Sequence, residues 1–327
     1  MKKIYIIMSL FWIFMVTITI SGCSNNRNEM QEQSEILQTN YNYKNPIIPE
    51  GFHAVETETA SWKRIDDGTV EGWNSGLVIE DDKGNQFVWV PCSVDENNEI
   101  VKYGRYFWTY TTDKGMQLIN YDERYIKHLT VTSTGEDYSY YEDDNKNEEV
   151  KEMVKKYGGF FIGRYELGYE NEEVVVKKGC NPVVDIDKKQ AVELTSNIIQ
   201  NKSVQTYLIT SFCYDTTIKW IEKSNHNFCE NPVKYQNFIE DNNYIAKNTG
   251  ESEETNNIYD FFGNVTEITT EKYSGNANID KFVHRSGIGK NISNIAKEAI
   301  LEEIFSQRRV SSEKSKIIGT RAIIIVK

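Results

Sequence analysis

The chain has 327 residues, with 37 Lys and Arg against 49 Asp and Glu, so its net charge is −12. Such an acidic chain is repelled by phosphate backbones and anionic lipid, which disfavours nucleic acid as a partner and membrane binding through charge. Few prolines together with 20 Tyr and 6 Trp indicate a folded globule rather than a disordered stalk.

Residues 1–22 have the pattern of a secretory leader. Lys2 and Lys3 precede an uncharged, largely apolar stretch from Ile4 to Ile20, and two small residues then stand before Cys23. The segment Ile20-Ser21-Gly22-Cys23 resembles the bacterial lipobox. In proteins with a lipobox, the cysteine is lipidated and becomes the mature N-terminus after cleavage. An uncleaved membrane helix is the alternative, but the polar segment that follows favours a lipoprotein.

Lipidation at Cys23 implies an extracytoplasmic protein anchored to the bacterial cell membrane, by more than one acyl chain such as palmitate. Residues 23–45 are polar and lack apolar periodicity, so they predict a flexible tether. Residues 46–327 are long enough for one large domain with polar insertions.

Strand signals open this domain. Residues 76–79 and 86–91 are apolar and flank Asp81-Asp82-Lys83-Gly84-Asn85, which predicts a strand, a tight turn and a second strand. Thr111–Asp144 is a polar, Tyr-rich stretch that predicts a surface insertion. Its Tyr138, Tyr140 and Tyr141 suit either a contact surface or a cover for the core.

Three helices are predicted beyond this insertion. The first spans 147–157, with Gly158 as its stop. Asp187 caps the second, and Thr210 or Ser211 caps the third. A buried strand is expected at 159–166, a second polar insertion at Glu222–Asn257, and a terminal strand at 319–326. Strands mixed with a few isolated helices predict the α+β class.

Four cysteines follow Cys23: Cys92, Cys180, Cys213 and Cys229. Outside the cytoplasm one or two disulfides are plausible, while buried free thiols are an equally open alternative. The spacing of these cysteines and of the four histidines matches no zinc-binding pattern.

Several segments, in chain order, resemble the formylglycine-generating enzyme (sulfatase-modifying factor) family. The resemblance is clearest over residues 157–327. Its segments are YGGFFIGRYE at 157–166, 209–221 around Tyr214-Asp215, IYDFFGNVTE at 258–267, 283–287, and 318–321. Residues 49–52 and 86–91 are similar to the start of a lipoprotein subgroup of that family. The resemblance implies a C-type-lectin-like α+β domain.

The family's enzymes are copper-using oxidases that depend on a cysteine pair after the strand matched by residues 283–287. Soft thiolates are the ligands that select Cu(I). Residues 285–327 contain no cysteine, which disfavours copper and a formylglycine-forming oxidase. We therefore expect a non-catalytic domain that binds a protein, peptide or glycan at the cell envelope. An enzyme with a non-standard active site is the alternative.

The resemblance also implies a structural calcium ion at the turn that contains Gly263, Asn264, Val265 and Glu267. Backbone carbonyls, carboxamides and carboxylates are the hard oxygen ligands that calcium takes. The alternative is a plain turn in which Asn264 caps backbone groups and Glu267 faces solvent. His284 and Arg285 are the candidate residues of a ligand pocket.

The lipoprotein prediction is tested by the variant Cys23→Ser in a bacterial host. Because an oxygen cannot replace the sulfur that carries the thioether-linked lipid, the variant should lose metabolic labelling by radioactive palmitate. It should also leave the membrane fraction or remain unprocessed. Ser24→Ala is the control and should keep both. Palmitate labelling of Cys23→Ser would contradict the prediction.

Overall fold

A computed structural model of the chain divides into two compact units, Met1–Asn42 and Tyr43–Lys327. It describes part of the second unit, namely residues 46–57, 63–64, 70–71, 76–95, 101–111, 115–121, 125–127, 139–225, 246–251, 254–274, 281–285 and 308–327. The leader, Cys23 and the tether lie outside these residues. None of the helices in the described ranges is long and apolar enough to cross a bilayer.

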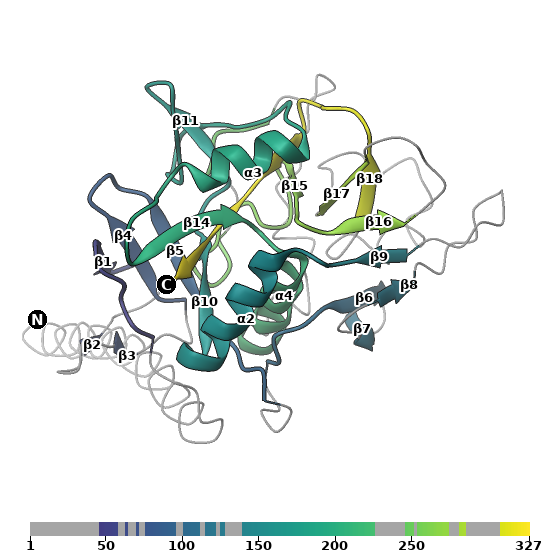
Figure 1. The fold of residues 1–327 in the computed structure, drawn as a ribbon, viewed down its shortest axis with the longest axis horizontal. Coiled ribbons are helices and arrows are strands. Elements are labelled where there is room, and N and C mark those ends of the chain that lie inside the picture. Colours follow the sequence, from purple (N-terminus) through teal and green to yellow (C-terminus); the bar gives the residue numbers. More distant parts are fainter. Residues whose placement is uncertain are drawn as a thin grey trace, which may run out of the picture. The chain divides into compact units, whose positions relative to one another are not determined.

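The described residues form an α+β structure of mostly strands with three helices, as the sequence predicts (Figure 1). Its largest sheet has six strands in the order β1-β4-β5-β10-β20-β14. Their bounds are Phe52–Val55 (β1), Val78–Asp81 (β4), Gln86–Pro91 (β5), Gly159–Gly163 (β10), Ala322–Val326 (β20) and Val204–Leu208 (β14).

The middle of this sheet is formed by continuous apolar runs. The three central strands, β5, β10 and β20, bury almost every side chain because both of their faces are covered. Helix α2 (Asn145–Tyr157) packs against β10 and β20, and α4 (Ser211–Ser224) packs against β5. Helix α3 (Lys188–Ser196) packs against β14 (Figure 1).

A second sheet has four strands in the order β18-β17-β15-β19. Their bounds are Arg308–Ser311 (β18), Phe282–Arg285 (β17), Thr266–Ile268 (β15) and Ile318–Thr320 (β19). Ile268, Phe282 and Ile318 of this sheet share one hydrophobic core with Phe87 and Phe161 of the larger sheet. The two sheets therefore belong to one packed domain.

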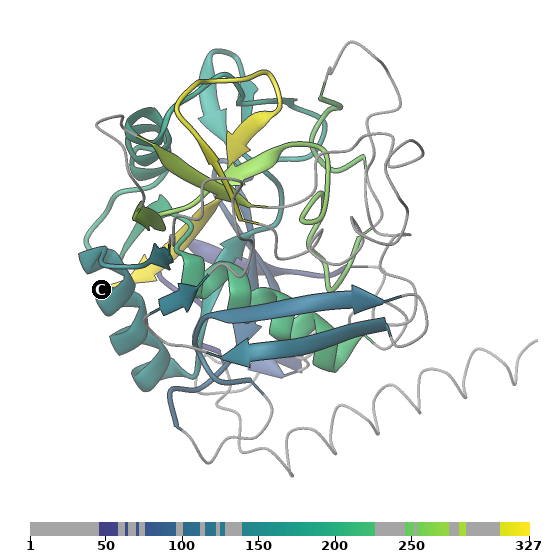
Figure 2. The same cartoon turned by 90° about the vertical axis from the view of Figure 1, so that its right-hand side faces the viewer.

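Smaller sheets lie outside this core. They pair Lys63–Arg64 (β2) with Val70–Glu71 (β3), Tyr106–Thr111 (β6) with Gly115–Tyr121 (β7), Gly168–Glu170 (β11) with Glu173–Val175 (β12) and Asn181–Pro182 (β13), and Ser139–Tyr141 (β9) with Tyr125–Lys127 (β8) and Lys272–Ser274 (β16). In Figure 2 the hairpin β6–β7 runs beside α4, with which β6 is in contact.

The predicted turn between residues 79 and 86 is confirmed as the link of the antiparallel pair β4–β5. Asp81 Oδ1 accepts hydrogen bonds from the backbone N–H of Lys83 (2.9 Å) and Asn85 (2.8 Å). Gly84 has a φ of 86°, a conformation that glycine adopts without strain. The side chain of Asp81 and the missing Cβ of Gly84 thus fix the turn.

The three predicted helices are confirmed together with their caps. Helix α2 ends at Gly158, which has a φ of 82°. Asp187 and Gln190 form a capping box at the start of α3. At α4 the choice between two caps is settled, because the hydroxyl oxygen of Thr210 accepts from the N–H of Cys213 (3.1 Å).

Two sequence predictions are wrong in part. The single terminal strand expected at 319–326 is divided at Arg321 into β19 and β20, because the backbone there passes from parallel pairing with β15 to antiparallel pairing with β10 and β14. In the stretch Glu222–Asn257, expected as a polar insertion, Thr249, Thr255 and Asn257 are buried. Their polar atoms make hydrogen bonds within the domain.

Gly159 is a position where the packing excludes any side chain. A Cβ there would overlap the carbonyl oxygen of Val90 and the indole ring of Trp89. We expect Gly159→Ala to lower the free energy of unfolding by about 3 kcal/mol in urea denaturation. Gly51→Ala is the control, because space is open around Gly51 and only its φ of 87° opposes alanine. The control should lose about 1 kcal/mol, and equal losses in the two variants would contradict the packing argument.

Candidate functional site

The turn before β15 is organised by the side chain of Asn264. This residue is buried and has a φ of 62°. Its Nδ2 donates to Glu166 Oε2 (2.7 Å) and to the carbonyl of Lys247 (3.1 Å), while its Oδ1 accepts from the N–H of Lys247 (2.8 Å). The N–H of Val265 donates to Glu166 Oε1 (3.1 Å). Asn264 therefore caps backbone groups, as one of the two alternatives predicted.

The plain-turn alternative also predicted that Glu267 faces solvent, and this part of it is wrong. It is fully buried, and its Oε1 accepts from Arg321 Nε at 2.7 Å. The guanidinium of Arg321 also donates to the carbonyls of Gly163 (2.9 Å) and Tyr259 (2.8 Å). Arg321 thus connects β15 to the end of β10 at the point where β19 becomes β20.

Negative charge is in excess around this arginine. Glu166, Asp260 and Glu267 are all buried. Burial raises the pKa of Glu267 to about 7, while the charge of Arg321 lowers it. Burial and the nearby Asp260 raise the pKa of Glu166 well above its usual range. Glu166 and Glu267 are consequently weaker acids than exposed glutamates.

The predicted calcium ligands are only partly available for an ion. The carboxamide oxygen of Asn264 already accepts a backbone hydrogen bond, and Oε1 of Glu267 is paired with Arg321. Glu267 Oε2 is a buried oxygen without a hydrogen-bond partner among the described residues. No group of three His, Cys, Asp or Glu side chains suited to a metal occurs in those residues. Calcium at Gly263, Asn264, Val265 and Glu267 stays a prediction that depends on backbone carbonyls.

A second group of charges surrounds Arg285. We call it the arginine cluster, and it consists of three buried guanidinium groups and two buried carboxylates: Arg105, Arg285, Arg308, Asp215 and Glu271. They come from the segment before β6, from α4, from the segment after β15, and from the strands β17 and β18. Arg285 and Arg308 lie opposite each other in the antiparallel register.

The cluster is held by direct ion pairs. Arg308 Nε donates to Glu271 Oε1 (2.8 Å), and its Nη2 donates to Asp215 Oδ2 (2.6 Å). Arg285 pairs with Asp215 and lies 3.5 Å from Glu271 Oε2, while Arg105 pairs with Glu271. The guanidinium of Arg285 is also 4.5 Å from the centre of the Tyr214 ring.

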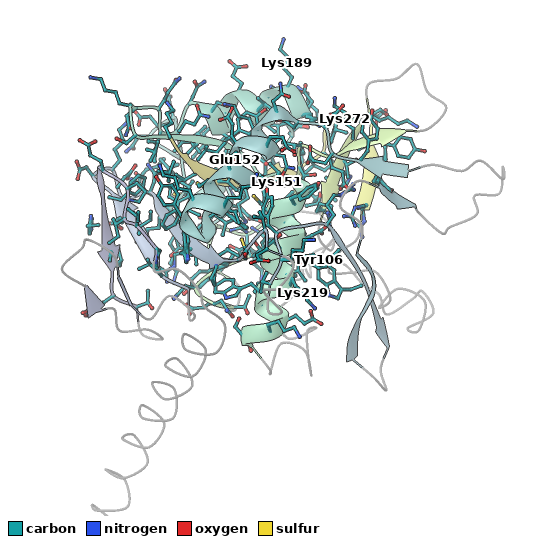
Figure 3. All side chains as sticks on the ribbon, turned by 60° about the horizontal axis from the view of Figure 1, so that its bottom comes forward. Tyr106, Lys151, Glu152, Lys189, Lys219 and Lys272 are labelled. Carbon is teal, nitrogen blue, oxygen red and sulfur yellow. The ribbon has the colours of Figure 1, made fainter. Side chains whose placement is uncertain are left out.

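The start of β6 is fixed to α4 by the same cluster. The N–H of Tyr106 donates to Asp215 Oδ2 (3.1 Å), and that of Gly104 donates to Thr216 Oγ1 (3.1 Å). Farther along α4, Lys219 lies over the ring of Tyr106, 5.9 Å from its centre (Figure 3). Arg105 is thereby positioned beside Arg308 by neighbouring backbone contacts.

Burial and mutual repulsion weaken the arginines as bases. The pKa of Arg105 falls to about 9 through burial and the charge of Arg308, and Asp215 opposes the fall. The pKa of Arg285 is lowered by the same two effects. With a pKa of about 9, Arg105 still carries a positive charge at neutral pH.

His284 and Arg285, the predicted pocket residues, do not share a pocket. They are neighbours on β17, so their side chains leave opposite faces of the strand. The imidazole of His284 is 6.2 Å from the ring of Phe282, and its Nδ1 has no hydrogen-bond partner within the described residues. Burial and the charge of Arg309 lower the pKa of His284 to about 4.

The three cysteines in the described ranges, Cys92, Cys180 and Cys213, are free and buried. Burial raises the pKa of Cys213 to about 12 and also raises that of Cys92. The hydroxyl of Tyr103 lies 3.6 Å from Cys213 Sγ. Cys229 and its pairing lie outside the described residues, as does Cys23.

Sequence reasoning missed Arg105, Arg308 and Glu271. Arg105 lies in an aromatic segment, and Arg308 and Glu271 each stand beside another charged residue, so no local pattern distinguishes these buried charges from solvated ones. The residue of the cluster that the sequence analysis did name as a candidate was Arg285, and Asp215 stood in another segment that resembles the family. Tyr140, left open as surface or core, is buried and accepts from Arg105 Nη1 (3.1 Å) at its carbonyl.

No family model and no curated protein matches the sequence. Among solved structures, the crystal structure of CarF matches 69% of this chain and 97% of its own chain, with 10% identity and a TM-score of 0.35. A likeness of this size carries no argument about fold or function.

The perturbed pKa values predict how stability depends on pH. His284 takes up a proton near pH 6.5 in the unfolded chain but only near pH 4 in the folded one. Its contribution to stability is therefore present above pH 6.5 and is lost as the pH falls to 4. In thermal or urea unfolding, the free energy of unfolding falls between pH 6.5 and pH 4, and His284→Phe should make this fall smaller by about 3 kcal/mol. The exposed His53, changed to Phe, is the control and should keep it.

The contribution of Glu267 to stability depends on pH in the opposite direction to that of His284. Its pKa is higher in the folded chain than in the unfolded one, so stability is lost as the pH rises from about 4.5 to 7. Without His284 this loss becomes visible, and the His284→Phe chain should be more stable at pH 5 than at pH 7. If calcium binds the Glu267 carboxylate, it favours the ionised form and should reduce that loss, with EDTA restoring it. An unchanged pH dependence in His284→Phe would contradict the assignment.

Proposed function

We propose that this protein is a lipoprotein anchored outside the cytoplasm through Cys23. Its domain is formylglycine-generating-enzyme-like, with a C-type-lectin-like fold, and it binds a protein, peptide or glycan at the cell envelope without performing the oxidation. The leader and the lipobox-like residues support the location. The argument for binding rests on the chemistry of the thiols.

Two pairings support the proposed fold. Segments that carry the resemblance are distant in sequence yet adjacent in the sheets. Strand β15, which overlaps residues 258–267, pairs with β17, which overlaps residues 283–287, and with β19, which lies within residues 318–321. The ion pair between Glu267 and Arg321 joins two of the resembling segments.

The observation that carries the functional proposal is the state of the cysteines. A cuprous oxidase needs two thiolates that reach solvent and substrate. In the described residues Cys92 and Cys213 are fully buried, and their raised pKa values keep them as thiols at neutral pH. Neither suits the role of a copper ligand that meets a substrate.

The charged groups also support a structural role for the candidate site. Asp215, Glu271 and Glu267 are occupied by arginines inside the domain. A buried ion pair adds little stability compared with a pair of apolar residues, but removing one partner leaves a buried charge and is strongly destabilising. Such pairs therefore specify one arrangement of the helices and strands. Loops on a rigid framework carry recognition, so we assign ligand binding to loops outside these buried charge clusters.

The proposal is tested with the purified protein, copper and a cysteine-containing peptide of the kind that sulfatases present. We expect no aldehyde product by mass spectrometry, and the same protein should sediment with isolated cell-envelope material. Cys213→Ala, in a folded sample, should bind as the unchanged protein does. Formylglycine that disappears in Cys213→Ala would overturn the binding-only function, and a protein that stays in the supernatant would overturn the envelope ligand.

A further inference from the structure

We draw no further inference here: the strongest candidate, the surface patch on the β11–β12 hairpin where Tyr169 is 44% exposed and lies between Val174 and Asn181 in the sheet register, carries no proposal because nothing in the described residues shows what covers it.

Discussion

The buried contact between Arg321 and Glu267 is the constraint on which the two main sheets depend. Arg321 stands where β19, a member of the four-stranded sheet, becomes β20, a member of the six-stranded sheet. Its guanidinium reaches Glu267 on β15, the carbonyl that ends β10, and the carbonyl of Tyr259. The side chain of Arg321 thus donates hydrogen bonds to backbone carbonyls at the place where the chain leaves one sheet and enters the other. A neutral apolar residue there would leave those carbonyls without donors.

The arginine cluster repeats this principle at the far side of the four-stranded sheet. There the carboxylates belong to α4 and to the segment after β15, and the arginines come from three other segments. Each partner is costly to bury alone, so the segments must meet in one arrangement. The apolar core supplies most of the driving force, and the charges select which strands meet.

Sequence reasoning found the elements whose signals are local. The turn at Gly84, the stop at Gly158 and the caps at Asp187 and Thr210 were all predicted, because each depends on one residue and its immediate neighbours. The class of the fold followed from the mixture of these elements. Pairing across long stretches was not predictable in this way, and the division of the terminal strand at Arg321 was missed for that reason.

The candidate site was predicted less well, because burial is a property of the whole fold. Arg285 was chosen from its place in a resembling segment, yet the arginines that surround it have no signal in the sequence. Glu267 was expected either to bind an ion or to face water, and its partner Arg321 is 54 residues away. Only the folded structure shows that such distant charged residues form ion pairs with each other.

The position of β20 constrains the order in which this domain can be assembled. Strand β20 lies between β10 and β14 and joins them into one sheet, but it follows β10 by more than 150 residues. Until residues 322–326 leave the ribosome, the apolar strand β10 has no neighbour on that edge. During synthesis the chain therefore exposes an unpaired apolar strand edge, which is prone to aggregation until a later segment pairs with it. Closure of the sheet waits for a strand far along the chain, and deleting residues 322–326 removes a central strand of the sheet.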